Sequence, residues 1–236
     1  MAGETSGLTR SVEDYLKVIY SIGDSGEAAS TSAIAEALDV QPASVTGMVK
    51  RLAESGFLEH VPYHGVRLTD AGTRQALRVL RRHRILETYL TVRLGYRWED
   101  VHEEAERLEH AASEELIERM ADALGNPSHD PHGAPIPTAS GEVEATEPLT
   151  LAELDPGEDA MVRAVRDDDS QGLQALEAAG LLPGTHLQLR TRQGTPAALE
   201  LEITGPEPRK LKLPLALARR VYVVPIPPTS SGQETK

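Results

Sequence analysis

The sequence predicts a mainly α-helical protein that is followed by a small all-β region. Over residues 8–125, apolar residues recur with the three-to-four-residue spacing of helices. From Met161 onward they alternate with polar residues, as in half-buried strands. Residues 126–147 separate the two parts and predict an irregular linker, because they are rich in Pro, Gly and Ser. The length of 236 residues allows two or three such compact units.

The first part of the chain predicts three helices and a hairpin. These elements are expected over residues 8–22, 33–38, 42–52, 57–61 and 66–68. Ser32 precedes the second helix as a capping residue, and Pro42 opens the third, where its missing amide hydrogen is not needed. Gly56 ends the third helix. His64 and Gly65 lie between two strand-like runs, which is typical of a hairpin.

Three more helices and five strands complete the expected order. The helices cover residues 71–94, a segment that begins near Asp100, and a segment that Ser113 caps and Gly125 ends. The strands cover residues 161–165, 186–189, 199–203, 211–213 and 221–224, and a short helix over 172–179 interrupts them. Short strands with turn residues between them predict a small barrel or sandwich. The residues after Pro228 are expected to be disordered.

The composition excludes several classes of protein and site. The chain has no Cys, which rules out disulfides, thiolate metal sites, iron–sulfur clusters and cysteine nucleophiles. Residues 1–10 hold no apolar core of signal-peptide length, and no apolar run approaches the ~20 residues of a membrane span. We therefore expect a soluble, cytoplasmic protein that has no membrane partner.

The formal net charge of −13 conceals two oppositely charged segments. Residues 50–84 hold eight basic and three acidic side chains, whereas residues 99–122 hold ten acidic and two basic ones. Charge segregated in this way indicates one surface that meets an anion and another that meets a cation. Taken singly, each run is also typical of a solvated helix face.

The order helix, turn, helix, hairpin over residues 32–67 is typical of a DNA-binding unit. Small and hydroxyl side chains open the second of these helices and let its backbone approach a major groove, and basic residues follow for phosphate contacts. The predicted DNA-binding residues are Gln41, Pro42, Ala43, Ser44, Thr46, Lys50, Arg51, His64 and Arg67. The alternative is an ordinary three-helix bundle with a hairpin.

The acidic segment indicates metal binding. If one helix covers it, the side chains that share an arc of about 100° are His102, Glu106, Glu109 and His110. Such a set can bind a divalent cation, although a short Glu-x-x-Glu-His run is more often a solvated face. The long helix carries His83 and Glu87 within an apolar stripe, where they must pair with each other or with a metal ion. The histidines expected to be structural or solvated are His60, His129, His132 and His186.

Six segments occur in one order over about the first 137 residues: Val12–Tyr20, Pro42–Leu52, His64–Thr69, Arg82–Glu87, Val101–His110 and Asp130–Pro137. Together they resemble the diphtheria toxin repressor and manganese transport regulator family. The resemblance implies a winged helix-turn-helix domain, a helical dimerisation and metal-binding domain, and a C-terminal β-barrel of the Src-homology type. The expected boundaries are residues 1–74, 75–147 and 148–228, with a disordered tail over 229–236.

The resemblance also implies a metal-activated, homodimeric regulator that binds inverted-repeat, double-stranded DNA and represses metal-uptake genes. Its primary metal site would involve Asp14, Glu106, Glu109 and His110. An ancillary site would use His83, Glu87 and His102, completed from the barrel by Asp169 and Gln171. Iron-responsive members carry Met and Cys where this chain has Asp14 and Glu106, so Mn(II) is the expected metal and Fe(II) the alternative. Lys17 occupies the position at which small manganese-responsive members carry an additional Glu.

Two other functions fit parts of the sequence. A metallohydrolase would use Glu106, Glu109 and the histidines around two ions, and it predicts turnover and an open metal position. A winged-helix regulator that answers an organic ligand would leave the same carboxylates solvated. Because the chain matches no nucleophile elbow or phosphate loop, we expect a regulator without enzymatic activity or a small-molecule substrate.

Overall fold

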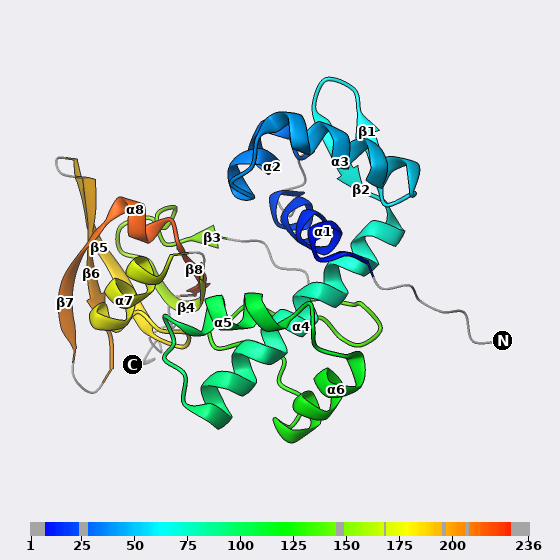
Figure 1. Ribbon diagram of the computed structural model, residues 1–236. Coiled ribbons are helices and arrows are strands. Elements are labelled where there is room, and N and C mark those ends of the chain that lie inside the picture. The colour runs from blue at the N-terminus through cyan, green and yellow to red at the C-terminus, as the bar shows by residue number, and fades with distance from the viewer. Residues whose placement is uncertain are drawn as a thin grey trace, which may run out of the picture. The chain divides into compact units, whose positions relative to one another are not determined.

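The computed structural model describes residues 8–23, 28–144, 149–167, 169–194, 197–205 and 208–227 (Figure 1). The chain forms two compact units. The first combines Met1–Leu86, Glu106–Ala123 and Ile136–Val143, and the second combines Glu87–Ala105, Leu124–Pro135 and Glu144–Lys236. The predicted tail over 229–236 lies outside the described residues.

The first unit begins with a winged helix-turn-helix, as predicted (Figure 1). Its elements are α1 (Arg10–Gly23), α2 (Thr31–Ala37), α3 (Pro42–Glu54), β1 (Leu58–Val61) and β2 (Gly65–Leu68). The two strands pair antiparallel with Leu58 opposite Leu68. All five elements contribute apolar side chains to one core, among them Leu16, Ile34 and Val45. Since this core takes up one face of α3, the opposite face is left exposed.

Two local features shape the start of α2 and the position of the hairpin. Ser30, and not the predicted Ser32, caps α2, because its hydroxyl accepts a hydrogen bond of 3.1 Å from the Ala33 amide. Both serines precede apolar helical residues, so the sequence alone did not distinguish them. Gly65 has a φ of 124°, and a side chain there would lie 2.1 Å from the Ala29 carbonyl oxygen. This close approach allows Ala29 and Val66 to pair through their backbones.

The helices that follow are α4 (Asp70–Leu94), α5 (Val101–Leu108) and α6 (Glu114–Ala123). Ser113 caps α6 as predicted, since its hydroxyl accepts a hydrogen bond of 3.2 Å from the Leu116 amide. The prediction of one helical arc through position 110 is wrong, because α5 ends at Leu108 and residues 109–111 form a turn. Of the helices in the described part of the chain, none is both long and apolar enough to cross a membrane.

The second unit contains the predicted all-β region. Its elements are β3 (Leu149–Thr150), β4 (Asp159–Val165), α7 (Ser170–Ala179), β5 (His186–Gly194), β6 (Ala197–Ile203), β7 (Arg209–Pro214), α8 (Leu215–Ala218) and β8 (Val221–Ile226). The strands form one six-stranded antiparallel sheet in the order β3-β8-β4-β5-β6-β7. Shifts of register after Val162 and after Leu189 bend this sheet around its apolar core. The Src-homology type of barrel is thereby confirmed, whereas β3 and α8 were too short to be predicted.

Candidate metal centres and nucleic-acid interface

The four residues predicted for a primary metal site gather in the first unit. Asp14 comes from α1, Glu106 from α5, and Glu109 and His110 from the turn after α5. Each offers one ligand atom, and these atoms all lie within 4.8 Å of one another. His110 Nε2 is 2.9 Å from Asp14 Oδ1 and 3.3 Å from Glu109 Oε1. Glu109 and His110 are consecutive, and on a helix their side chains would point about 100° apart. The turn after α5 is what lets both side chains reach the same place.

Burial and neighbouring charges act on two of these carboxyl groups with different outcomes. Burial raises the pKa of Asp14, and the charges of His110 and Lys17 offset it only in part. Burial also favours the neutral form of Glu109. The hydrogen bond and charge of His83 outweigh it, together with the smaller effects of the charge and hydrogen bond of Lys17, and they lower the pKa of Glu109. Glu109 is therefore held as a carboxylate, which is the form that binds metal.

Lys17 of α1 lies in the same group of side chains. Its ammonium group bonds to Glu106 and donates a hydrogen bond of 2.7 Å to Glu109 Oε1. Only 13% of the side chain is exposed. Burial disfavours the charged form, yet the charges of Glu109 and Glu106 outweigh it and raise the pKa of Lys17. The group thus combines three acidic side chains, one imidazole and one buried ammonium, and we call it the primary cluster.

Glu13, which the sequence prediction missed, orients His110. His110 Nδ1 lies 2.7 Å from Glu13 Oε2, and Glu13 Oε1 accepts a hydrogen bond of 2.5 Å from Arg82. Glu13 is buried although it is charged. With Nδ1 directed at Glu13, the other ring nitrogen faces Asp14 and Glu109. In the sequence, the only signal for the burial of Glu13 was its place directly after the apolar residue Val12.

His83, predicted for the ancillary site, contacts the primary cluster. Its Nδ1 lies 2.6 Å from Glu109 Oε2 and 3.8 Å from Glu106 Oε1. The ring is buried, and it lies on α4 one turn before Glu87. His83 therefore supports the carboxylate of Glu109 from the side opposite to Lys17, which bonds to the other oxygen.

Glu87 and His102, also predicted for the ancillary site, lie in a second group within the second unit. Glu87 of α4 lies 3.2 Å from Nδ1 of His102 in α5, and Asp167, which follows β4, lies 3.6 Å from the same nitrogen. Asp130 and His132 each bring one ligand atom to within 4.8 Å of Glu87. The residues around Glu87 in the second unit are called the ancillary cluster here, and they are Glu87, His102, Asp130, His132 and Asp167. Glu87 and His132 are both completely buried.

The acidic side chains of the ancillary cluster change the pKa of its two histidines. Burial lowers the pKa of His102, but Asp167 and Glu87 outweigh it and raise the pKa to about 10. For His132, Glu87 outweighs burial in the same way and the pKa rises to about 9. Burial favours the neutral form of Asp167, yet the hydrogen bond from His102 lowers its pKa to about 2. A place where both imidazoles hold protons this firmly has a negative potential and suits a cation.

Asp169 and Gln171, predicted as ligands from the barrel, take part in a helix cap. The Asp169 side chain accepts a hydrogen bond of 3.1 Å from the Gln171 amide at the start of α7. Of the described residues in this segment, Asp167 is the one that faces His102. The sequence shows several acidic residues after β4, including Asp167 and Asp169. It does not show how the backbone turns there, and that turn decides which carboxylate faces His102.

The linker supplies Asp130 and His132 to the ancillary cluster, and His132, which was predicted to be structural or solvated, is completely buried there. Asp130 Oδ1 accepts hydrogen bonds of 2.8 and 3.0 Å from the amides of His132 and Ala134, which folds the linker into a tight turn. Gly133 completes the turn with a φ of 87°, and a side chain there would lie 2.1 Å from the Arg163 carbonyl oxygen. The linker can therefore approach β4 closely, which buries the neighbouring imidazole of His132. The ring of Trp98 lies beside it, with centroids 5.1 Å apart.

Both clusters fit a divalent cation. Carboxylates and imidazoles are hard and borderline donors, and no sulfur is among them. Among the described residues, no group makes a hydrogen bond of regular geometry with the buried Nε2 of His110 or the buried Nδ1 of His132, although carboxylate oxygens lie 2.9 and 3.8 Å away. Because buried polar atoms are normally paired, an imidazole nitrogen that only faces carboxylates indicates a position where a metal ion binds well.

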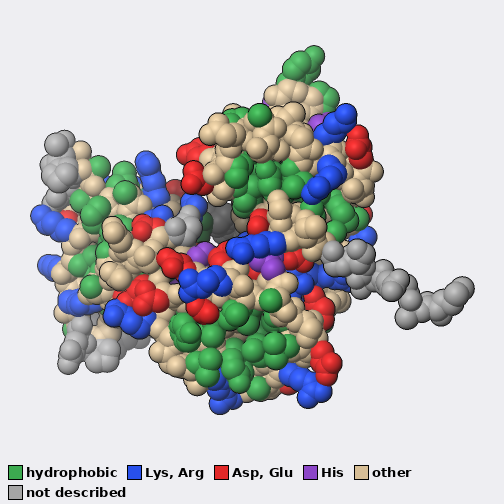
Figure 2. All heavy atoms as spheres, viewed as in Figure 1, with side chains coloured by type: hydrophobic (Ala, Val, Ile, Leu, Met, Phe, Trp, Pro, Cys, Tyr) green, Lys and Arg blue, Asp and Glu red, His purple; other side chains and the backbone are tan. Residues whose placement is uncertain are grey.

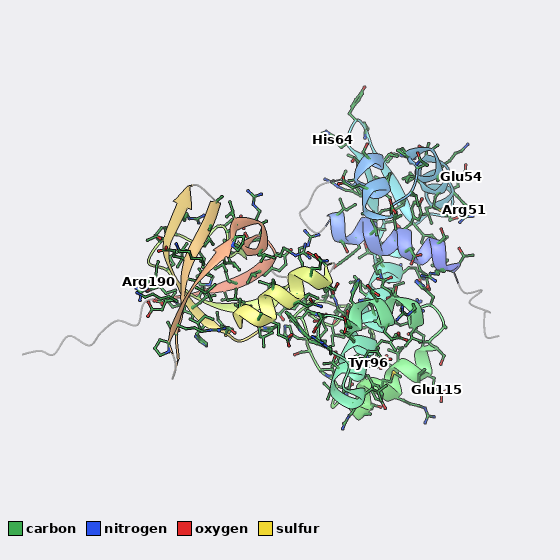
Figure 3. All side chains as sticks on the ribbon, turned by 60° about the vertical axis from the view of Figure 1, so that its left-hand side comes forward. Arg51, Glu54, His64, Tyr96, Glu115 and Arg190 are labelled. Atoms are coloured by element: carbon green, nitrogen blue, oxygen red, sulfur yellow. The ribbon has the colours of Figure 1, made fainter. Side chains whose placement is uncertain are left out.

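The predicted DNA-binding residues form an exposed surface of the first unit. Every one of them is exposed: Gln41, Pro42, Ala43, Ser44, Thr46, Lys50, Arg51, His64 and Arg67. Arg51 and His64 both point outward, one from α3 and the other from the hairpin (Figure 3). The Thr46 hydroxyl donates to the Pro42 carbonyl at 3.1 Å, so its methyl group and its oxygen lone pairs are what it presents to a partner. Tyr63, at the tip of the hairpin, is fully exposed and was not predicted.

The sequence matches three family models in succession. Residues 7–66 match "Iron dependent repressor, N-terminal DNA binding domain". Residues 69–138 match "Iron dependent repressor, metal binding and dimerisation domain". Residues 149–225 match "FeoA domain". These three ranges together account for most of the chain.

Named proteins are similar over the same regions. The iron-dependent repressor IdeR of Mycobacterium tuberculosis is 32% identical over 228 residues, which cover 92% of this chain and 97% of the relative. The HTH-type transcriptional regulator MntR of Oceanobacillus iheyensis is 40% identical over 116 residues, or 49% of this chain and 78% of the relative. A solved structure described as a manganese-dependent transcriptional repressor in complex with manganese has a TM-score of 0.84 and 35% identity, covering 91% of this chain and all of its own.

Proposed function

The chain belongs to the iron-dependent repressor family of metal-dependent transcriptional regulators, which includes the diphtheria toxin repressor, and we propose that Mn(II) is the ion that activates it. In this proposal a homodimer binds inverted-repeat DNA when metal is bound and represses metal-uptake genes. The observation that carries the proposal is the primary cluster, in which ligand atoms of three carboxyl groups and one imidazole gather in the same unit as α3.

The donor atoms support Mn(II) over softer ions. Asp14, Glu106 and Glu109 are hard oxygen donors and His110 is a borderline nitrogen donor. The chain has no Cys, and none of its four Met residues belongs to the cluster. Affinity alone does not decide the physiological ion, because later transition metals bind most sites more tightly. Fe(II) is the alternative, since the Mycobacterium tuberculosis relative is described as an iron-dependent repressor.

In the primary cluster, the residues of this chain would act by joining two elements. Asp14 lies on α1, which packs in the same core as α3 and the hairpin. Glu106, Glu109 and His110 lie at and after the end of α5. A bound divalent cation would supply positive charge shared by these donors, so that α1 and the α5 turn hold one arrangement. We infer that DNA binding selects this arrangement from those that the metal-free protein samples.

The ancillary cluster would hold a further divalent ion through the carboxylate and imidazole groups around Glu87. His102 and His132 must lose their protons to coordinate a metal, whereas Glu87, Asp130 and Asp167 already offer oxygen atoms. We assign this cluster a modulating role, because its ligands come from α4, α5, the linker and the barrel and none from α1 or α3. Removing it should change the metal concentration that activates the protein more than it changes DNA contacts.

The DNA contacts would come from α3 and the hairpin. Lys50, Arg51 and Arg67 supply positive charge for phosphates, and Ser44 and Thr46 face the base edges. A winged helix-turn-helix places such a helix in the major groove and its hairpin beside the neighbouring backbone. Because one such unit reads only half of an inverted repeat, two copies of the chain are required.

Exposed apolar side chains near the end of α4 support a homodimer. Val92 is 63% exposed, Leu94 is 61% exposed, and Tyr96, two residues after Leu94, is 39% exposed. Hydrophobic side chains gather over the C-terminal half of α4 in Figure 2. An exposed apolar patch of this kind marks a protein interface. The matched family model for residues 69–138 is itself described as a dimerisation domain.

A gel-shift experiment tests the proposal. The full chain is incubated with the promoter of its own gene and with promoters of metal-transport genes, with Mn(II), with Fe(II) under anaerobic conditions, and with a chelator. We expect retention of promoter DNA with Mn(II) and its loss with chelator, and the same loss in Asp14→Ala. Metal-independent retention by both proteins would contradict the proposal, and metal-stimulated hydrolysis without DNA retention would favour a metallohydrolase.

A further inference from the structure

The ammonium group of Lys17 lies between two carboxylates of the primary cluster, those of Glu106 and Glu109. It contacts Glu106 and donates a hydrogen bond of 2.7 Å to Glu109 Oε1. The same Glu109 oxygen is 3.3 Å from His110 Nε2, the imidazole nitrogen that faces Asp14. The oxygen atoms that would bind a metal therefore already hold a positive charge that belongs to the chain itself.

The surroundings keep Lys17 charged in this position. Its side chain is 13% exposed and that of Glu109 is not exposed at all. A buried carboxylate without a counter-charge is strongly destabilising, and here Asp14, Glu106 and Glu109 contribute to one cluster. Arg10 is the other basic residue of α1 near this cluster, but it is 64% exposed and lies 3.9 Å from Asp14. Lys17 is thus the buried one of the two cations that α1 directs at the acidic side chains.

We propose that Lys17 is an internal counter-ion that competes with the divalent metal for Glu106 and Glu109 and thereby sets the metal concentration at which this regulator responds. The inference rests on the proposed function, because it assigns the primary cluster to metal. In the metal-free protein, the Lys17 ion pairs stabilise the acidic cluster. When metal binds, the ammonium group leaves these oxygens without any proton transfer, and the stabilisation that it supplied is lost.

This competition links two measurable quantities. If Lys17 contacts the carboxylates only in the metal-free state, then removing its charge destabilises the metal-free protein and leaves the loaded protein almost unchanged. The metal affinity must rise by the same free energy that the metal-free protein loses, because the two processes share one thermodynamic cycle. If the Lys17 ion pairs instead persist after metal binding, removing the Lys17 charge would destabilise the metal-free and the metal-loaded protein equally. The metal affinity would then stay unaltered.

The test compares the full chain with Lys17→Gln, with Arg10→Gln as a matched control and with Lys17→Arg as a charge-preserving variant. Mn(II) affinity is measured by competition with a fluorescent chelator, which does not require the metal-free protein to be isolated. Thermal unfolding is followed with chelator and with saturating Mn(II). An opposite charge within about 4–6 Å changes the preference for a charged state by one to three powers of ten. We therefore expect Lys17→Gln to tighten Mn(II) binding by at least about tenfold.

The same variant should melt at a lower temperature than wild type in chelator and at nearly the same temperature in Mn(II). Arg10→Gln should change the affinity by less than about twofold, because exposed ion pairs contribute little, and Lys17→Arg should stay close to wild type. Unchanged or weaker Mn(II) binding in Lys17→Gln would overturn the inference, as would an equal effect of Arg10→Gln. If wild type itself binds no Mn(II), the proposed function fails instead, and the two failures are thereby distinguished.

Discussion

His110 Nδ1 lies 2.7 Å from Glu13 Oε2, and this contact decides which nitrogen of the imidazole faces the primary cluster. Glu13 is in turn held by Arg82 through a hydrogen bond of 2.5 Å. The pair resembles the carboxylate–histidine arrangement found behind many metal ligands, where the carboxylate fixes the ring tautomer and orientation. Two adjacent residues of α1 therefore have different tasks: Glu13 positions the imidazole, and Asp14 faces its other nitrogen.

The Glu13→Gln variant should bind Mn(II) about 10–100-fold more weakly than wild type, because a carboxylate behind a ligating histidine contributes that much to metal affinity. The amide keeps the shape of the side chain but weakens the bond to His110 Nδ1 and the pairing with Arg82. Calorimetric titration with Mn(II) measures the change. An unaltered affinity in a folded variant would mean that His110 is oriented by other groups.

The metal-free protein should lose stability as the pH rises from about 6.5 to about 10, because the pKa of His102 is raised to about 10 from a reference value of 6.5. The protonated imidazole stabilises the fold fully below the lower value, and this contribution disappears as the pH passes the higher one. Chemical denaturation in chelator across this range measures the effect. The His102→Gln variant should show a shallower decline than wild type, and identical slopes would exclude this ion pair as the cause.

Trp98 should report metal binding at the ancillary cluster, because it is the single tryptophan of the chain and its ring lies 5.1 Å from that of His132. Mn(II) is expected to quench its fluorescence. His132→Gln should remove most of this response, whereas Asp14→Asn should leave it in place because Asp14 belongs to the primary cluster. A response that Asp14→Asn abolishes and His132→Gln spares would reverse the assignment.

Charge removal on α3 should lower DNA affinity for all sequences alike. The logarithm of the binding constant should fall with the logarithm of salt concentration by about 0.9 per neutralised phosphate, so Lys50→Ala and Arg51→Ala should each flatten this slope. Ser44→Ala should alter base preference and keep the slope. Lys212→Ala, which removes an exposed charge from β7, is the matched control and should behave as wild type. An intact slope in both α3 variants would move the DNA surface elsewhere.

Replacing hard donors by soft ones should change the activating ion. The double variant with Asp14→Met and Glu106→Cys is expected to respond to Fe(II) or Co(II) better than to Mn(II), because thioether and thiolate ligands favour later ions. DNA retention is measured against metal occupancy for each ion under anaerobic conditions. If the double variant keeps the wild-type ranking of ions, ligand hardness does not set the response.

The sequence by itself predicted most of the elements and four of the residues that the fold gathers in the primary cluster. Helical periodicity and turn residues fixed α1, α3, α4 and the hairpin, since these patterns follow from local backbone geometry and from one apolar face for each element. Asp14, Glu106, Glu109 and His110 were assigned through the family resemblance, and the fold brings them within 4.8 Å of one another. The exposed surface of α3 likewise follows from the burial of Val45 and Val49 on its other face.

Only the tertiary structure decided which groups meet across long separations in the chain. Asp167 and not Asp169 faces His102, because the backbone after β4 turns Asp169 into the cap of α7. His132 enters the ancillary cluster because Gly133 allows the linker to approach β4 closely. Lys17 and Glu13 acquire their roles from carboxylates and an imidazole about ninety residues away. Hydrophobic periodicity shows which face of a helix or strand is buried, but not which element packs against that face. Contacts between distant residues are therefore fixed by tertiary packing and by the need to pair buried charges.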